Sequence, residues 1–370
     1  MNTFKIKEIH NSDLYGIIVE NTNIGAELLK VSGASDTIYY TKIPYSKLYQ
    51  KKEYGDFYRS ISKEYINKVL DKEIADNVDA NINFVLVSSW QLNTENINGW
   101  LGLYINNTKY YFHYSFIPNL DEKRDYLINI ISATGINILH SAINGSVNVV
   151  ESADDNIILD QAYINDDVNY HLLLNTLEKR ETDYFLVFDK EEPIRFIDLM
   201  RRSNEFSILR GSFNPIHYGH NALIEQGKKQ YPHATSALLV STFRYDKEHL
   251  NINEMISKIK TINSHGYPLI ICKNPYFYGA FDLFNIWGQD KQYYLMVGCD
   301  TINRILKTDT EQNIDTKYKV NYYKDNFKFI LFNRVGYNRD KNTHIYDDMI
   351  IENNDYIDDG ISSTKLRNII

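Results

Sequence analysis

The chain has few of the residues that define several classes of protein. Its 370 residues include only two cysteines, Cys272 and Cys299, which stand far apart and form no C-x-x-C pair. Disulfide frameworks and cysteine-rich zinc sites need closely spaced cysteines, so we expect neither, and a reducing compartment fits the sequence. No cluster of His, Cys and Asp residues indicates a metal held by the protein itself.

Long apolar runs are also absent. No stretch approaches the roughly 20 apolar residues that a membrane helix needs, and Met1 to Glu8 contain no signal-peptide core. We therefore expect a cytoplasmic protein without a membrane partner.

Basic residues do not cluster, and the formal net charge is -8. A nucleic-acid surface needs grouped lysines and arginines, so we expect no nucleic-acid partner. Nucleotides need only a few local cations and stay possible ligands. With 43% hydrophobic residues, a chain of this length is long enough for two domains.

Residues 206–220 hold the most informative pattern. Phe206 to Leu209 have the length and composition of a buried strand, and Gly211 to Pro215 are typical of a turn. His217 and His220 then stand three apart where a helix begins. Free N–H groups and the helix dipole favour an anion at such a helix start, and both histidines lie on one face of its first turn. This stretch therefore predicts a phosphate site.

The stretch Gly211-Ser-Phe-Asn-Pro-Ile-His-Tyr-Gly-His fits the pattern G-x-F-x-P-x-H-x-G-H and resembles the first signature of the nucleotidylyltransferase superfamily. The resemblance implies that His217 and His220 are catalytic. It implies that the following residues bind the nucleotide: Gly211, Ser212, Phe213, Asn214 and Gly219.

From residue 206 the chain alternates between strand and helix patterns, which indicates a parallel sheet. We expect strands at 206–210, 236–242, 268–272, 293–297 and 327–333, with helices near 219–230, 252–264, 278–286 and 300–307. The predicted fold class is α/β, with a C-terminal Rossmann-like doubly wound parallel sheet. Ligands of such sheets bind beyond the carboxyl ends of the strands.

Two segments after the fourth and fifth strands resemble further parts of the superfamily. Gly298-Cys-Asp300-Thr301 resembles the G-x-D-[TS] segment that contacts adenosine; an aspartate here alone could be a helix cap, but the histidine motif upstream favours ligand contact. Arg334 lies in an R-x-G segment similar to that of mononucleotide adenylyltransferases. Lys247, after the second strand, is a candidate phosphate contact or an ordinary surface lysine. Aromatic residues near the third strand end, at 275–279 and Trp287, could stack on a pyridine ring or belong to the core.

Residues 361–367 match I-S-S-T-x-[IL]-R, the second signature of the superfamily. Hydroxyls and N–H groups at a helix start cradle phosphate oxygens, and an arginine one turn later can bind the same group. The resemblance implies phosphate binding by Ser362, Ser363 and Thr364, and a catalytic Arg367. Its arginine form favours a mononucleotide adenylyltransferase over a cytidylyltransferase.

The first 140 residues predict another α/β domain, and three segments of it resemble the CinA-like, or nicotinamide mononucleotide (NMN) deamidase, family. Glu20-Asn-Thr-Asn-Ile-Gly stands where the family has E-S-C-T-G-G, Ser32-Gly-Ala-Ser matches P-G-[SA]-S, and Pro44-Tyr45-Ser46 matches Y-S-N. The family's serine falls at Asn21 and its lysine at Gln50, so the resemblance implies a degenerate site. Thr22 is the one hydroxyl near the nucleophile's place, and the helix start around Gly25 and Ala26 could still bind a nucleotide.

We therefore expect a CinA-like domain over 1–140, a structured connector over 141–205 and a nucleotidylyltransferase domain over 206–370. A chain of this plan resembles a fusion family assigned to nicotinamide-nucleotide adenylylation. The resemblance implies ATP with Mg²⁺ and a mononucleotide as substrates, with NAD or deamido-NAD as product. Three alternative functions stay open: a cytidylyltransferase, a phosphopantetheine-type adenylyltransferase and a non-catalytic nucleotide sensor. A homo-oligomer is also possible.

Overall fold

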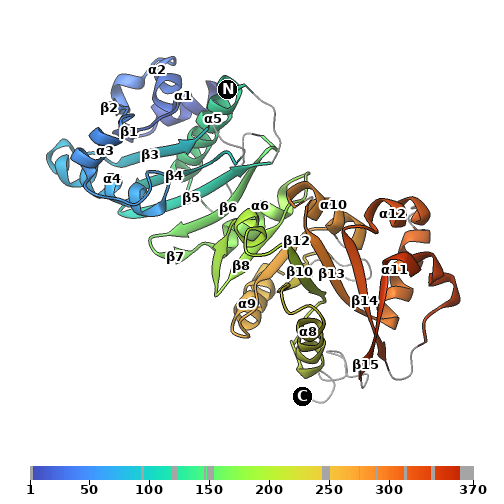
Figure 1. The fold of residues 1–370 in the computed structure, drawn as a ribbon. Helices are drawn as coiled ribbons and strands as arrows, with labels where there is room; N and C mark the ends of the chain where they lie inside the picture. Colours follow the sequence, from blue (N-terminus) through green and yellow to red (C-terminus); the bar gives the residue numbers. More distant parts are fainter. Residues whose placement is uncertain are drawn as a thin grey trace. The chain divides into compact units, whose positions relative to one another are not determined.

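The computed structural model describes residues 3–92, 96–117, 123–145, 147, 154–243, 251–274, 276–288, 290–311, 315–334 and 338–358. The chain forms two compact units, Met1–Thr182 and Asp183–Ile370. Each unit has its own sheet with helices packed on it (Figure 1).

The first unit is built on a seven-stranded sheet of order β2-β1-β3-β4-β5-β6-β7. Its strands are β1 (Gly16–Val19), β2 (Ile38–Lys42), β3 (Phe84–Gln91), β4 (Asn98–Ile105), β5 (Thr108–Phe116), β6 (Ile157–Ile164) and β7 (Asp167–Val168). Its helices are α1 (Thr3–His10), α2 (Ile24–Leu29), α3 (Lys47–Tyr54), α4 (Lys63–Asp76), α5 (Arg124–Ile143) and α6 (Tyr170–Lys179). The strands β1, β2 and β3 are parallel, and the rest of the sheet continues antiparallel from β3.

Two helices cover opposite faces of this sheet because successive strand residues point to opposite sides. Ile66 of α4 packs against the backbone at Gly102 of β4, whereas Gly135 of α5 lies beside the neighbouring Leu101. A glycine just after an apolar helical pattern often marks the end of a helix, so the sequence predicts that a helix over 121–134 ends before Gly135, and this is wrong. The helix runs on to Ile143, because Gly135 is the point at which Ile24 of α2 approaches it closely.

The helix α5 is, by length and composition alone, the one described helix that could cross a membrane. A stretch of 18 residues within it has a mean hydropathy of 1.3, so it is more apolar than the sequence analysis expected of any stretch. However, 56% of this segment is buried, and α5 packs against α1, α2, β3 and β4. Its apolar residues are therefore those of a core helix.

The second unit contains an eight-stranded sheet of order β15-β14-β13-β10-β11-β12-β8-β9. Its strands are β8 (Leu186–Asp189), β9 (Glu192–Ile194), β10 (Glu205–Arg210), β11 (Thr235–Ser241), β12 (Leu269–Cys272), β13 (Gln292–Gly298), β14 (Phe327–Arg334) and β15 (Ile350–Asp358). Its helices are α7 (Phe196–Met200), α8 (Tyr218–Gln230), α9 (Ile252–Asn263), α10 (Phe277–Trp287), α11 (Cys299–Glu311) and α12 (Thr316–Tyr323). The strands from β10 to β15 are parallel, and their order runs outward in both directions from the adjacent pair β10 and β13.

This arrangement confirms the predicted doubly wound α/β fold. Parallel strands buried on both faces read as continuous apolar runs, and four consecutive residues of β10, 206–209, are fully buried. The strand order reverses between β10 and β13, where ligands of such sheets bind beyond the carboxyl ends of the strands.

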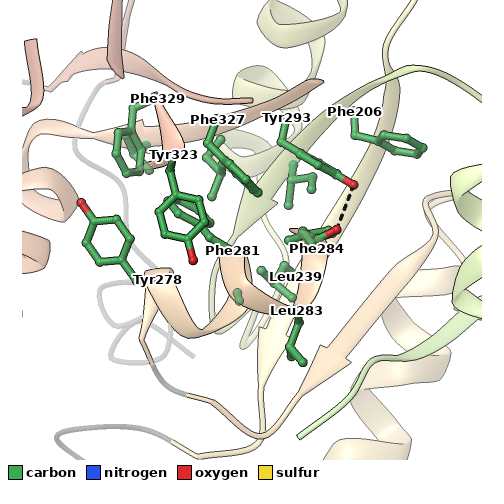
Figure 2. Packing of buried hydrophobic residues seen from close by; sticks show 14 of the residues in the cluster. Phe206, Leu239, Tyr278, Phe281, Leu283, Phe284, Tyr293, Tyr323, Phe327 and Phe329 are labelled. Atoms are coloured by element: carbon green, nitrogen blue, oxygen red, sulfur yellow. Dashed lines mark hydrogen bonds between the residues drawn. The ribbon is translucent and has the colours of Figure 1, made fainter. Parts of the chain in front are cut away.

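Aromatic side chains fill one side of this sheet. Phe281 and Phe284 of α10 pack against Tyr293 of β13 and Phe327 of β14 (Figure 2), with ring centroids 4.4 Å apart for Phe281 and Phe327. The Tyr293 hydroxyl donates to the carbonyl of Phe284 at 3.5 Å. The helix α10 is thereby fixed on the sheet, and the aromatic Trp287 packs against this core.

The predicted connector over 141–205 is not a separate element. Strands β6 and β7 and helix α6 complete the first unit, because β6 pairs with β5. Strands β8 and β9 and helix α7 belong to the second unit, because β8 pairs antiparallel with β12 of its sheet. The boundary lies after Thr182, so the units extend beyond the domain limits of 140 and 206 expected from the sequence.

Candidate active site

The paired histidines lie at the start of α8, directly after the turn that follows β10. His217 is the N-cap residue, and the two imidazole rings face each other with centroids 3.7 Å apart and planes 32° apart. The N–H of His217 donates to Nδ1 of His220 at 3.2 Å. A neutral His220 ring therefore carries its proton on Nε2, where it can donate to a ligand.

Two residues of the first signature support the histidines by packing. Phe213 is buried, and its ring meets His220 edge-on with centroids 5.0 Å apart. Gly219 leaves room for His217, since a Cβ atom there would lie 3.1 Å from its Nδ1 atom. The Phe213 side chain, expected from the sequence to contact nucleotide, thus lies under the histidine ring, while Ser212 and Asn214 are exposed.

A lysine that the sequence analysis missed holds the same turn. Lys258 lies on the buried face of α9 with Met255, Ile259 and Ile262, and its Nζ donates to the carbonyl of Ser212 at 2.6 Å. The sequence does contain a signal for this residue, because Lys258 stands at helical spacing among apolar residues that are buried. The ammonium group therefore brings a positive charge to the backbone of the first signature.

The segment Gly298-Cys-Asp300-Thr301 lies beside the histidine turn. The strands β10 and β13 pair in parallel with Leu209 opposite Met296, so Gly211 and Gly298 leave the sheet at the same edge. Asp300 lies in the first turn of α11, and its Oδ1 is 2.7 Å from where a Cβ of Gly298 would be. The carboxylate of Asp300 therefore folds back over Gly298 at the switch point of the sheet.

Arg210 is a second residue that the sequence analysis missed. It is the last residue of β10, and its Nη2 donates to the carbonyl of Asn274 at 3.0 Å. Its guanidinium carbon lies 4.6 Å from the ring centroid of Phe277. Burial lowers the pKa of Arg210 and raises that of the nearby Cys272 thiol to about 12. The arginine still keeps its charge, because its ordinary pKa is so high.

Other predicted site residues lie outside the described residues. They are Lys247, Ser362, Ser363, Thr364 and Arg367. Arg334 ends β14, the neighbour of β13, and its side chain also lies outside the description. The contribution of these residues stays a prediction.

In the first unit, Asn21 and Gln50 stand at the deamidase positions, and both side chains donate hydrogen bonds to backbone carbonyls. Asn21 Nδ2 donates to the carbonyl of Trp90 at 3.0 Å, and Gln50 Nε2 donates to the carbonyl of Pro44 at 2.5 Å. Tyr45 is 73% exposed. Thr22 is buried and donates to the Glu20 carboxylate at 2.6 Å.

The start of α2, where the sequence suggested that a nucleotide could bind, is already occupied by the side chain of Glu20. Its two carboxylate oxygens accept from the N–H of Ile24 at 2.6 Å and from the N–H of Gly25 at 2.7 Å. Glu20 is buried, so a carboxylate of the chain itself occupies the anion position at this helix start. These two N–H groups are not available to a phosphate in this structure.

With this geometry in place, comparison with known proteins identifies the class. Residues 208–369 match the sequence model of the family described as cytidylyltransferase-like. The second unit therefore carries a cytidylyltransferase-like domain, which supports nucleotidyltransferase activity. No curated protein sequence matches the chain.

Solved structures similar to the chain are of the two kinds that the sequence resemblances named. A nicotinic acid mononucleotide adenylyltransferase of Plasmodium falciparum, complexed with NaAD, is 19% identical with a TM-score of 0.32, covering 44% of this chain and 82% of that one. A CinA superfamily protein of Klebsiella pneumoniae is 6% identical with a TM-score of 0.32, covering 39% of this chain and 96% of that one. A competence/damage inducible protein of Agrobacterium tumefaciens is 12% identical with a TM-score of 0.30, covering 39% and 97%. The assignment of the class rests on the family model and on the signature residues.

Proposed function

We propose that the chain joins ATP to nicotinamide mononucleotide or nicotinate mononucleotide, giving NAD or deamido-NAD and pyrophosphate. The observation that carries the proposal is the pair His217 and His220 at the start of α8, beside the point where the strand order reverses. This is where a doubly wound sheet binds nucleotide phosphates. The arginine form of the second signature, ending in Arg367, supports an adenylyl donor with a mononucleotide acceptor.

In the proposed reaction, a phosphate oxygen of the acceptor attacks the α-phosphorus of ATP. The bond from that phosphorus to the β-phosphate oxygen breaks, and pyrophosphate leaves with the electron pair. No covalent intermediate on the protein is needed, so the site contributes position and charge stabilisation. His220, whose Nδ1 accepts the backbone N–H of His217, would donate its Nε2 proton to the transferring phosphate.

The remaining phosphate contacts follow from the signatures. His217 would share the α- and β-phosphates with His220, while Ser363, Thr364 and Arg367 would hold the β- and γ-phosphates. The metal enters as part of the substrate Mg·ATP. Mg²⁺ prefers oxygen ligands and usually keeps several waters, whereas the described site gathers two imidazoles and one carboxylate, that of Asp300. The phosphates and water would therefore supply most of its ligands.

The description of the matched family favours a second candidate, a cytidylyltransferase. One panel separates the two. The purified protein is incubated with Mg·ATP or Mg·CTP and with each acceptor: both mononucleotides, phosphopantetheine, and a sugar or polyol phosphate. Pyrophosphate release with ATP and a mononucleotide is the expected result. Pyrophosphate release with CTP and a sugar or polyol phosphate, and none with ATP and either mononucleotide, would contradict the proposal.

A further inference from the structure

Arg210 lies on the opposite face of the sheet from the histidine helix. Side chains alternate along β10, and Ser207 packs against Gly227 of α8, while Phe206 and Ile208 belong to the aromatic core under α10. Arg210 continues this second set, as its contact with Phe277 at the start of α10 confirms. Its guanidinium is thus next to the first signature in sequence but is separated from the histidines by the sheet.

One end of this guanidinium is held and the other is not. Nη2 donates to the carbonyl of Asn274, and the Phe277 ring supports the flat face of the group. Nη1 is buried and has no hydrogen-bond partner anywhere in the described part of the chain. A buried charged donor left unpaired is costly and rare in folded proteins. The rest of the side chain is oriented, so the free Nη1 is a fixed donor.

The surrounding charges leave the guanidinium in need of an anion. Asp183 is the carboxylate that acts electrostatically on Arg210, but both of its oxygens accept backbone N–H groups. Those N–H groups belong to Lys273 and Asn274, at 2.9 and 2.7 Å. Arg304 of α11 acts on Arg210 with a charge of the same sign. No ion pair involves Arg210 among the residues that the structure describes.

We propose that Nη1 of Arg210 binds the ring carboxylate of a nicotinate mononucleotide acceptor, whose phosphate must instead lie beside the ATP phosphates at the histidines. This inference rests on the proposed function. The histidines on the other face bind the phosphates of ATP, so a cation on this face at the same sheet edge serves the second substrate. An arginine prefers a carboxylate or phosphate to a neutral carboxamide, because two charges strengthen the hydrogen bond. Arg210 would therefore select the nicotinate form over the nicotinamide form.

The test compares acceptor kinetics of the full chain with those of Arg210→Met. Turnover is measured with Mg·ATP and each mononucleotide, and the KM for ATP is measured alongside. We expect the acceptor KM to rise about 10- to 100-fold, the scale of one charge-assisted hydrogen bond, with the KM for ATP unchanged. The rise should be confined to the nicotinate form, because only that form carries the ring carboxylate. An equal rise for both forms would contradict the assignment.

Two further variants guard against a folding defect. Arg210→Lys keeps a charge of smaller reach and should fall between the wild type and Arg210→Met. Arg202→Met removes the same charge from an exposed ion pair with Asp189, so its acceptor KM should match the wild type. Acceptor KM values unchanged in both a folded Arg210→Lys and a folded Arg210→Met would overturn the inference. Absence of wild-type turnover with either mononucleotide would instead overturn the proposed function, and the inference with it.

Discussion

Gly227, in the middle of α8, offers a test of how packing positions the catalytic helix. It is buried against β10 and β13, where a Cβ atom would lie 2.6 Å from Met296 Sδ and 2.7 Å from Ser207 Oγ. Two opposing effects decide the outcome of Gly227→Ala. Alanine gains roughly 1 kcal/mol over glycine inside a helix, while overfilling a packed core costs roughly 1–3 kcal/mol.

The structure indicates that the cost prevails. Ser207 is fully buried and its hydroxyl donates to Met296 Sδ at 3.5 Å, so displacing either atom disturbs this contact. We expect Gly227→Ala to lower the free energy of unfolding by about 1–2 kcal/mol, the upper part of the net range. The helix also carries His217 and His220, and a misplacement of about 1 Å can cost roughly 100-fold in rate. A shift of a few tenths of an ångström should therefore lower kcat by about 10-fold.

Urea unfolding of four proteins measures the effect: the wild type, Gly227→Ala, Ser207→Ala and the double variant. Ser207→Ala removes the oxygen that the new methyl group would meet. The double variant should therefore recover part of the stability and part of kcat. A single Gly227→Ala variant that is more stable than the wild type would show that the helix approaches the sheet less closely than the structure has it.

Three other predictions concern single side chains. His220→Ala should lower kcat by about 10²–10³, the usual effect of losing one transition-state donor, in a protein that still folds, whereas the exposed control His233→Ala should keep normal turnover. Lys258→Met should lower kcat/KM for ATP about 10-fold because the Ser212 carbonyl loses its charged donor, and Lys258→Arg should restore part of it in the same assay. Glu73 is buried and accepts from Tyr54 at 2.8 Å and Lys42 at 3.1 Å, so Glu73→Gln should lower the free energy of unfolding by about 1–3 kcal/mol in urea titration. Normal turnover in folded His220→Ala, unchanged kcat/KM in Lys258→Met, or unchanged stability in Glu73→Gln would contradict the respective argument.

The sequence could predict those features that depend on neighbouring residues. The strands of the second unit are continuous apolar runs because both faces of a parallel sheet are buried, so β10 to β14 were found at nearly their true limits. The turn and helix start at Gly211 to His220 are likewise specified by local residues. Features set by distant contacts could not be predicted. Gly135 ends no helix because it faces Ile24, more than a hundred residues earlier.

The same reason explains the site residues that were missed. Lys258 reads as one polar position on an amphipathic helix, and only the packing of α9 brings its ammonium to Ser212. Arg210 reads as the polar end of a strand, and its role depends on Asn274 and Phe277 beyond β12. Glu20 belongs to a segment recognised from the sequence, yet its direction toward the N–H groups of Ile24 and Gly25 depends on the local turn.

The first unit supplies the final prediction, that the chain does not hydrolyse the NMN amide. Asn21 stands at the family's serine position, and a carboxamide nitrogen is neither acidic nor nucleophilic enough to attack another carboxamide. Gln50 stands at the lysine position and is bound to the carbonyl of Pro44, so it provides no general base. Thr22 is the hydroxyl nearest in sequence. It is buried and shares Glu20 Oε2 with the N–H of Ile24.

The measurement is ammonia release from NMN by the full chain without ATP, so that adenylylation cannot consume the substrate. We expect none from the wild type and none from Thr22→Ala. Ammonia from the wild type that disappears in Thr22→Ala would refute the prediction and identify Thr22 as the nucleophile. A second measurement tests whether inorganic phosphate binds at the start of α2, where the Glu20 carboxylate occupies the anion position. Inorganic phosphate should leave the unfolding of the wild-type first unit unchanged. Stabilisation by phosphate that persists in His220→Ala but is lost in Gly25→Pro would mean that the helix start binds anions despite Glu20.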